Sequence, residues 1–236
     1  MSAIALSLLA IATFLATAVG TGLLRPWLVK RNILDYPGQE AGRYVHEVPT
    51  PRGGGLAIYL ALIAAWIIIA SESPDVPTET GWILLCSLGL AIPAWVDDLG
   101  NVSSIVRFLA QIVTATSGTF LLTGPLPVFQ GLLPPVLDTC LTIFLWVGFT
   151  NLFNFTDGID GNAATKGMVL GLGIFTLSIF GGISSGLAEL SITAAAASVG
   201  FLVWNWYPAR IFMGDIGSIP LGFLLGWLLL CLATEG

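Results

Sequence analysis

The stretch Asn151-Leu-Phe-Asn-Phe-Thr-Asp-Gly-Ile-Asp-Gly161 lies between two long apolar runs. Two side-chain amides, Asn151 and Asn154, come three residues apart, and two carboxylates, Asp157 and Asp160, follow at the same spacing. A helical turn would place the two carboxylates on neighbouring positions of one face. Ionisable groups at a membrane boundary are costly and usually functional, so we expect a site here. A hydrophilic loop between two spans is the simpler alternative.

The composition predicts a membrane protein. Hydrophobic residues make up 56% of the 236 residues and charged residues 9%, and the mean hydropathy is +0.91. Soluble domains carry roughly 25% charged residues. Cys86, Cys140 and Cys231 lie inside apolar runs, so neither a disulfide framework nor a zinc site is expected. We therefore predict an all-α, polytopic transmembrane helical bundle that forms one domain over residues 1–236.

Eight apolar runs are expected to span the bilayer, over residues 4–24, 56–70, 81–96, 105–122, 136–149, 167–180, 187–206 and 219–233. If the spans alternate in direction, four of the loops share one side, and all eight bases fall there or at its edge. These bases are Arg25, Lys30, Arg31, Arg43, Arg52, Arg107, Lys166 and Arg210. The positive-inside rule makes that side cytoplasmic. The pattern thus predicts a multi-pass membrane protein with its N-terminus outside.

Five carboxylates are predicted on the same side: Asp97, Asp98, Asp157, Asp160 and Asp215. Carboxylate and amide oxygens suit Mg²⁺, which usually takes one or two carboxylates together with substrate phosphates. Bases on the same face would complement phosphate charge. The pattern favours phosphoryl transfer on an anionic substrate at the membrane surface. An ion channel or a proton-coupled transporter is the alternative, but transporters tend to hold such acids near the midplane.

Three further features carry separate expectations. Asp97 and Asp98 end the third run, where acids oppose the helix dipole, so we expect them to serve function rather than stability. Asp215 suits either a helix cap or an anion-binding helix start. His46 and Arg52, in the first loop, precede three glycines whose N–H groups would meet a phosphate, or which would allow close helix packing.

Four stretches carry a family resemblance. They are His46-x-x-Pro-Thr-Pro-Arg-Gly-Gly-Gly55, Trp95-Val-Asp-Asp98, Asn151-x-x-Asn-Phe-x-Asp-Gly-Ile-Asp-Gly161 and Asn205-x-x-Pro-Ala-Arg-Ile-Phe-Met-Gly-Asp-x-Gly-Ser218. In this order they resemble the polyprenyl-phosphate N-acetylhexosamine-1-phosphate transferases. Details of the first and third stretches look more like the branch that initiates O-antigen or surface polysaccharide than the peptidoglycan branch.

The resemblance implies a reaction between a UDP-N-acetylhexosamine and undecaprenyl phosphate that gives an undecaprenyl-diphosphate sugar and UMP. It implies Mg²⁺ as cofactor, with Mn²⁺ as a substitute, and a homodimer in the lipid bilayer. Which sugar is transferred stays open. Nucleic-acid binding is not expected, because the bases line a membrane face.

The resemblance also assigns roles. Asn154 and Asp215 match the metal site. Asp97 and Asp98 match paired acids with base or metal-orienting roles, and Asp157 and Asp160 match acids lining the nucleotide pocket, which we count with the catalytic set. The residues expected to bind substrate are His46, Arg52, Asn151, Asn205, Phe212 and Arg210.

One departure concerns the C-terminal part. Relatives usually have further spans and a later cytoplasmic loop rich in histidine and arginine, whereas this sequence ends at Gly236 after eight spans. We therefore expect that loop to be missing. A catalytically incomplete membrane remnant or assembly partner is the alternative function, and a divalent-cation transporter is a third.

Overall fold

The computed structural model describes residues 1–36, 48–100, 102–121 and 127–235. The described residues form eight α-helices: α1 (Ala3–Lys30), α2 (Gly55–Glu72), α3 (Thr80–Leu99), α4 (Ser104–Phe120), α5 (Pro135–Phe155), α6 (Asn162–Phe180), α7 (Ser185–Asn205) and α8 (Asp215–Glu235). A short 3-10 helix, η1 (Thr156–Gly158), follows α5. His46 and Arg43 lie outside the described residues.

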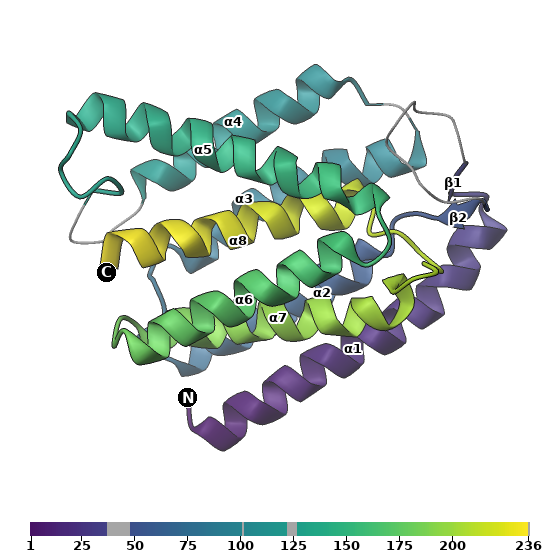
Figure 1. Cartoon of the computed structure of the whole chain (residues 1–236), viewed down its shortest axis with the longest axis horizontal. Coiled ribbons are helices and arrows are strands. Elements are labelled where there is room, and N and C mark those ends of the chain that lie inside the picture. Colours follow the sequence, from purple (N-terminus) through teal and green to yellow (C-terminus); the bar gives the residue numbers. More distant parts are fainter. Residues whose placement is uncertain (37–47, 101, 122–126, 236) are drawn as a thin grey trace.

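The predicted all-α membrane bundle is confirmed. Each of the eight predicted runs corresponds to one helix, although several helices extend beyond the predicted bounds. Seven of the eight helices are long and apolar enough to cross a membrane. The exception is α4, which has 17 residues. The helices lie side by side, and the chain termini are both at the left-hand end of the bundle in Figure 1.

Two predictions near the site are wrong: the end of the fifth span, and the helical face that Asp157 and Asp160 were expected to share. Helix α5 continues past residue 149 to Phe155, so Asn151 and Asn154 lie on its last two turns. After η1 the backbone becomes extended at Ile159, so Asp157 and Asp160 do not share a helical face. The helix continues because both amides find partners on neighbouring helices, whereas the sequence Asp-Gly-Ile-Asp-Gly turns the chain into α6.

Helix α8 forms the centre of the bundle. In the apolar windows of α8 and α7, 78% and 72% of the residues are buried, against 11% for α1. In Figure 1 α8 runs between α5 and α6. A helix that is apolar on all sides suits such a position. At its middle the Trp146 ring of α5 stacks on Phe223 at 4.6 Å, and its Nε1–H donates to the Phe223 carbonyl oxygen at 2.9 Å.

A two-residue strand pair closes the right-hand end of the bundle (Figure 1). Strand β1 (Leu34–Asp35) pairs antiparallel with β2 (Thr50–Pro51). The Arg52 N–H donates to the Ile33 carbonyl oxygen at 3.2 Å, which extends the contact by one residue. This pairing fixes the chain on both sides of the undescribed 37–47 segment and delivers Arg52 to the end of the bundle.

Glycine contacts allow α2 and α8 to approach each other closely. A Cβ placed on Gly217 would overlap the Cα of Gly55, and a Cβ on Gly55 would overlap the Cα of Gly217. The three-glycine stretch is therefore used for helix packing, one of the two alternatives that the sequence leaves open. The N–H groups of Gly54 and Gly55 donate to the carbonyl oxygens of Phe212 and Met213 at 3.0 and 2.8 Å, so the prediction that these amides meet a phosphate is wrong.

We predict that Gly217→Ala lowers the free energy of unfolding by roughly 1–3 kcal/mol, because the backbones of α2 and α8 must separate. The matched control is Gly89→Ala in α3, where an added Cβ meets nothing within 4 Å. It should be neutral or stabilising, since alanine favours a helix interior. Thermal unfolding in detergent, followed by circular dichroism, measures both variants. Equal stability of the two would contradict the close contact.

Candidate active site

The start of α8 is held by two buried carboxylates from other parts of the chain. The four consecutive backbone N–H groups of residues 213–216 donate to them. Asp157 accepts the first two, at 3.0 and 2.6 Å, and Asp98 accepts the last two, at 3.1 and 2.9 Å. Helix starts leave N–H groups free and carry partial positive charge, so carboxylates suit them.

This arrangement gives Asp98 a stabilising contact that the sequence did not indicate, while its functional role stays a prediction. At the end of α3 its carboxylate opposes that helix's dipole, which is why function was favoured over stability. In the structure the same carboxylate faces the start of α8, where the dipole favours it. Asp215 is correspondingly the first residue of α8, and its own N–H is one of those accepted by Asp98.

Gly214 makes the turn into α8 possible. Its φ is +73°, a left-handed conformation that glycine adopts readily. A Cβ at this position would lie 2.6 Å from the backbone nitrogen of Gly53 and 2.7 Å from Asp98 Oδ2. Only glycine therefore lets the two carboxylates reach the amides of this turn.

Asn154 links α5 to α8. Its Nδ2 donates to Asp215 Oδ1 at 2.7 Å and to Ser218 Oγ at 2.8 Å. The Ser218 hydroxyl in turn donates to the Gly214 carbonyl oxygen at 2.8 Å. The two side chains predicted for the metal site are thus in direct contact, although they are 61 residues apart in sequence.

Arg107, in the first turn of α4, connects two of the acids. Its Nη1 lies 2.9 Å from Asp97 Oδ2 and also contacts Asp215 Oδ2. The other oxygen of Asp97 accepts the Val102 N–H at 2.7 Å. A single cationic nitrogen therefore stands where the carboxylates from α3 and α8 converge. The buried Nε of Arg107 has no hydrogen-bond partner among the described residues.

Arg52 approaches the same acids from the first loop. Its Nη2 donates to the Asp98 carbonyl oxygen at 3.3 Å, and its Nη1 lies 3.6 Å from Asp35 Oδ1. Its Nε is also buried and, within the part of the chain that the structure describes, unpaired. Two guanidinium groups thus present free donors beside the acidic cluster.

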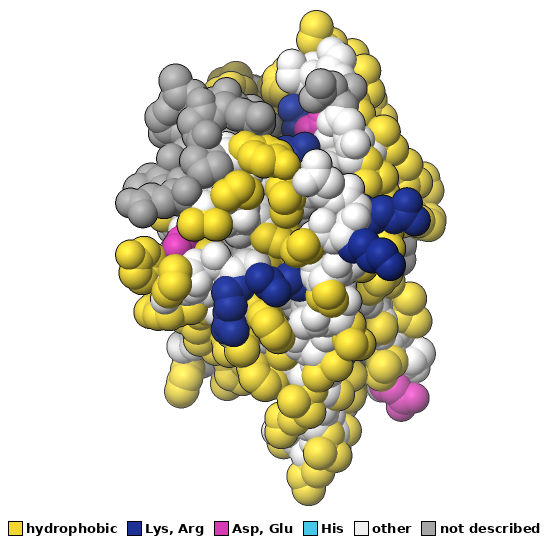
Figure 2. All heavy atoms as spheres, turned by 90° about the vertical axis from the view of Figure 1, so that its right-hand side faces the viewer, with side chains coloured by type: hydrophobic (Ala, Val, Ile, Leu, Met, Phe, Trp, Pro, Cys, Tyr) yellow, Lys and Arg dark blue, Asp and Glu magenta, His cyan; other side chains and the backbone are white. Residues whose placement is uncertain are grey.

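These groups line one polar cavity of about 80 Å³ at the right-hand end of the bundle in Figure 1. Its lining residues are Asp35, Arg52, Asp97, Asp98, Arg107, Asn154, Asp157, Gly158, Gly214 and Asp215. Six of them were predicted as site residues from the sequence. Figure 2 looks onto this end of the molecule and shows Lys and Arg side chains scattered among apolar ones.

Five predicted site residues lie outside this cavity. Asn205 is buried and bridges the Gly161 N–H and the Ile211 carbonyl oxygen, at 3.1 and 2.9 Å. Asp160 accepts the Ala209 N–H at 2.9 Å. These two side chains fasten the α7–α8 loop to the turn before α6.

The other three also have local partners. Phe212 is buried in the core. Arg210 is exposed, with its guanidinium 4.7 Å from the Trp204 ring centroid. Asn151 donates to Gln111 Oε1 and to the Val147 carbonyl oxygen. The substrate-binding roles of these residues stay predictions, as does that of His46.

Two larger hollows lie beside the cavity, toward α4 and α5. A polar notch of about 160 Å³ is lined by Arg107, Gln111, Asn151 and Asn154 among others. It shares Phe108 and Asn151 with an apolar groove of about 480 Å³ between α4 and α5. The cavity, the notch and the groove thus adjoin one another through shared lining residues.

Comparisons with known proteins bear on this arrangement. The model of glycosyl transferase family 4 matches residues 81–233, which hold the α3, α5 and α8 parts of the cavity. The chain belongs to glycosyl transferase family 4. The resemblance inferred from the four sequence stretches is thereby confirmed.

Several curated relatives of this family 4 chain carry informative names. It is 33% identical to a decaprenyl-phosphate N-acetylglucosaminephosphotransferase of Mycolicibacterium smegmatis, over 94% of this chain and 58% of that protein. It is 30% identical to a probable undecaprenyl-phosphate N-acetylglucosaminyl 1-phosphate transferase of Bacillus subtilis, over 90% and 59%. A phospho-N-acetylmuramoyl-pentapeptide-transferase of Syntrophus aciditrophicus is 30% identical, over 90% and 69%. The chain thus spans less than two thirds of the first two relatives.

The cavity of this family 4 chain offers only part of the ligand shell of a hard divalent cation. Among the described residues no group of three or more His, Cys, Asp or Glu side chains is arranged to hold a metal. Asp97 and Asp215 nevertheless each place one carboxylate oxygen against the same nitrogen, Nη1 of Arg107. A metal ion at that position would contact both carboxylates. Since Mg²⁺ usually binds one or two carboxylates and completes its shell with water and phosphate, this donor set fits it.

Sequence reasoning missed Arg107, Asp35 and Ser218 as members of this site. Arg107 was counted only as one of the bases on the predicted cytoplasmic side. A signal for it existed, because it is the single base within an otherwise apolar predicted span close to the Asp97–Asp98 pair. Ser218 lay inside a quoted stretch, but its contact with Asn154 depends on how α5 and α8 pack.

We predict that Asp157→Asn destabilises the family 4 chain by about 1.5–3 kcal/mol, since one amide oxygen cannot replace two carboxylate oxygens that accept N–H groups. Asp160→Asn is the matched control, because Asp160 is only half-buried and accepts one N–H, from Ala209. Its loss should be smaller. Denaturant unfolding in detergent compares the two. A larger loss for Asp160→Asn would show that the α8 start does not depend on Asp157.

Proposed function

We propose that this chain transfers N-acetylhexosamine-1-phosphate from a UDP-sugar to undecaprenyl phosphate or a related polyprenyl phosphate. The products are a polyprenyl-diphosphate sugar and UMP. The observation that carries the proposal is a polar cavity lined by acids and two arginines, which adjoins an apolar groove between α4 and α5 through a notch that shares lining residues with both. The names of the relatives, which join a polyprenyl phosphate to an N-acetylated sugar phosphate, support it.

The reaction needs one bond to form and one to break. An oxygen of the lipid phosphate attacks the sugar-bearing phosphorus of the UDP-sugar. The bond from that phosphorus to the bridging oxygen breaks, and this oxygen leaves with UMP. Such phosphoryl transfers depend on positioning and charge stabilisation more than on covalent chemistry. A site made of fixed charges therefore suits the reaction.

The two arginines would hold the phosphates. The Nε groups of Arg52 and Arg107 are buried and have no partner within the described part of the chain. Guanidinium donors bind phosphate oxygens through paired hydrogen bonds. Because Arg52 comes from the first loop and Arg107 from α4, they approach the cavity from two elements and would orient the two phosphates relative to each other.

The acids divide into two groups by their contacts. Asp98 and Asp157 each use both oxygens to accept backbone N–H groups of the α8 start, which supports a positioning role. Asp97 and Asp215 each direct one oxygen at Arg107. We propose that Asp97, Asp215 and the Asn154 amide hold Mg²⁺. When bound, the ion would neutralise phosphate charge as it develops during the transfer.

The lipid acceptor would lie in the α4–α5 groove. This groove is lined by apolar side chains such as Phe108, Ile143 and Phe144, and the notch at its polar end reaches Arg107. A polyprenyl tail in the groove would bring its phosphate to the edge of the cavity. A lipid substrate also accounts for a site at the end of a membrane bundle.

The same proposal includes the orientation in the membrane. Seven of the eight bases are in the described residues, and those of the cavity lie at one end of the bundle with the α1 C-terminus. By the positive-inside rule this end faces the cytoplasm of a bacterial inner membrane, where UDP-sugars are available, and the N-terminus lies outside. The product would begin an O-antigen, surface polysaccharide or related cell-envelope glycan.

We predict that Asp215→Asn lowers UMP release by at least about 100-fold, because the variant loses a charged metal ligand. The assay combines the purified chain, undecaprenyl phosphate, Mg²⁺ and either UDP-N-acetylglucosamine or UDP-N-acetylmuramoyl-pentapeptide. Glu72→Gln, exposed at the end of α2, is the control and should keep full activity. Absence of any lipid-linked product from the unaltered chain would overturn the proposal, and so would full activity in Asp215→Asn.

We also predict that Arg107→Gln strengthens Mn²⁺ binding in the absence of substrate by about tenfold. A guanidinium and a divalent cation cannot occupy the same point between Asp97 and Asp215, so removal of one cation favours the other. Electron paramagnetic resonance of free Mn²⁺ measures the affinity. Lys30→Gln removes the same charge at the exposed end of α1 and should leave it unchanged. Weaker binding in Arg107→Gln would exclude a metal at these two carboxylates.

A further inference from the structure

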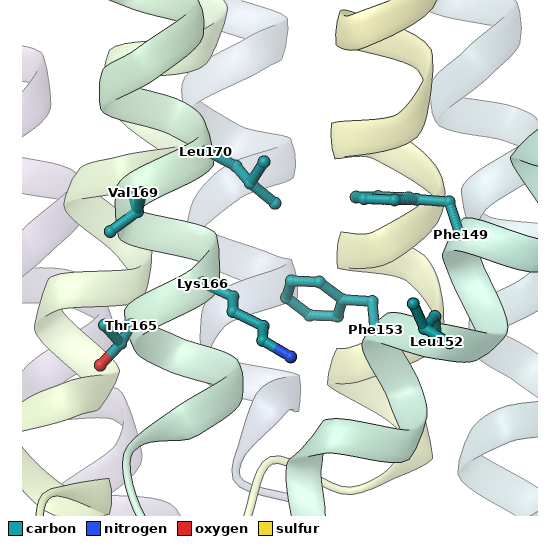
Figure 3. Close-up of a pocket in the computed structure, with 7 residues that line it drawn as sticks. All are labelled: Phe149, Leu152, Phe153, Thr165, Lys166, Val169 and Leu170. Atoms are coloured by element: carbon teal, nitrogen blue, oxygen red, sulfur yellow. The ribbon is translucent and has the colours of Figure 1, made fainter.

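A second apolar groove lies on the opposite side of α5. It has a volume of about 400 Å³, within the usual size range of ligand sites, and it opens between α5 and α6. Its walls are apolar side chains of the two helices: Phe149, Leu152 and Phe153 from α5, and Val169 and Leu170 from α6. In Figure 3 the side chains of Phe149, Phe153 and Leu170 extend toward the space between the two helices.

One cation belongs to this groove. Lys166 extends from the second turn of α6 across the opening toward Phe153 (Figure 3). It is exposed, and no hydrogen bond or ion pair joins it to another described residue. Its position near the α6 start puts the ammonium group at the same end of the bundle as the polar cavity. The groove therefore joins an apolar floor to a single positive charge at its polar end.

We propose that this groove binds an anionic phospholipid of the surrounding bilayer, with an acyl chain along the apolar floor and the head-group phosphate at Lys166. Basic side chains at the level of the lipid head groups attract anionic lipids, and a lysine stem can lie along apolar surface while its charge stays in water. The groove thus offers both an apolar surface for an acyl chain and a positive charge for a head group.

The groove is separate from the proposed acceptor path. It shares no lining residue with the polar cavity, the polar notch or the α4–α5 groove. A phosphate held at Lys166 would therefore not be presented to Arg52 and Arg107. This separation favours a resident phospholipid over the reacting polyprenyl phosphate.

A lipid in this groove would touch a wall of the polar cavity. Phe153 is buried and packs closely on α8. A Cβ added at Gly222 of α8 would lie only 3.1 Å from the Cβ of Phe153. The next residue, Asn154, binds Asp215 and Ser218. Lipid packed against Phe153 and Leu152 would thus support the last turn of α5, which carries Asn154.

Photo-crosslinking tests the proposal without requiring enzymatic activity. The purified chain is placed in nanodiscs that contain a photoactivatable phosphatidylglycerol or the matching phosphatidylcholine, and the labelled peptides are mapped by mass spectrometry. We expect phosphatidylglycerol to label residues 149–153 and 165–170 about five times more than phosphatidylcholine does. Equal labelling by the two lipids would overturn the proposal.

Two variants and a competition experiment with undecaprenyl phosphate test which residues and which lipid account for the labelling. Lys166→Gln should abolish the preference for the anionic lipid, whereas Lys30→Gln, with the same charge change at the exposed end of α1, should keep it. Val169→Trp, which fills the groove, should reduce labelling by both lipids. A preference that survives Lys166→Gln would refute the site. Displacement of the label by equimolar undecaprenyl phosphate would assign the groove to the acceptor and would also refute it.

Discussion

The structure depends on one set of hydrogen bonds, those from the four amides at the start of α8 to two buried carboxylates. Asp157 comes from the turn after α5 and Asp98 from the end of α3, so these bonds join three parts of the chain. A helix that starts inside a protein must satisfy its free N–H groups, since water does not reach them. The two acids meet this need and at the same time surround the cavity with negative charge.

The negative charges of the cavity are offset by nearby hydrogen-bond donors and positive charges. Asp97 and Asp215 meet at Arg107, and Arg52 stands beside the backbone of Asp98. Every carboxylate that lines the cavity is therefore paired, either with amides or with a guanidinium. A buried charge without a partner would be costly. The arrangement is stable in itself, yet it leaves the buried Nε groups of Arg52 and Arg107 without a partner among the described residues.

Helix α5 lines both the polar cavity and the α5–α6 groove. One side of its last turns presents Asn151 and Asn154 to the polar notch and cavity, and the other presents Leu152 and Phe153 to the α5–α6 groove. Consecutive residues on a helix point in different directions, so one short segment serves both surfaces. The membrane around the bundle is thus in contact with side chains adjacent to the site.

The sequence by itself determined the class of the protein and the end of the bundle at which its polar groups gather. The length of the apolar runs requires helices, because a chain in lipid must satisfy its backbone hydrogen bonds internally. The four family stretches contain eight residues that line the cavity, six of which were predicted as site residues. This succeeded because hydropathy and local spacing are properties that a sequence displays directly.

Only the tertiary structure decided which polar residue does what. Asp157 and Asp160 look equivalent in the sequence, but one accepts amides of the α8 start and the other fastens the α7–α8 loop. The three glycines at the start of α2 looked suited to phosphate, but the amides of Gly54 and Gly55 donate to the chain before α8. Arg107 was not singled out at all. These roles depend on contacts between residues distant in the chain, and the spacing along one segment carries no information about where another segment packs.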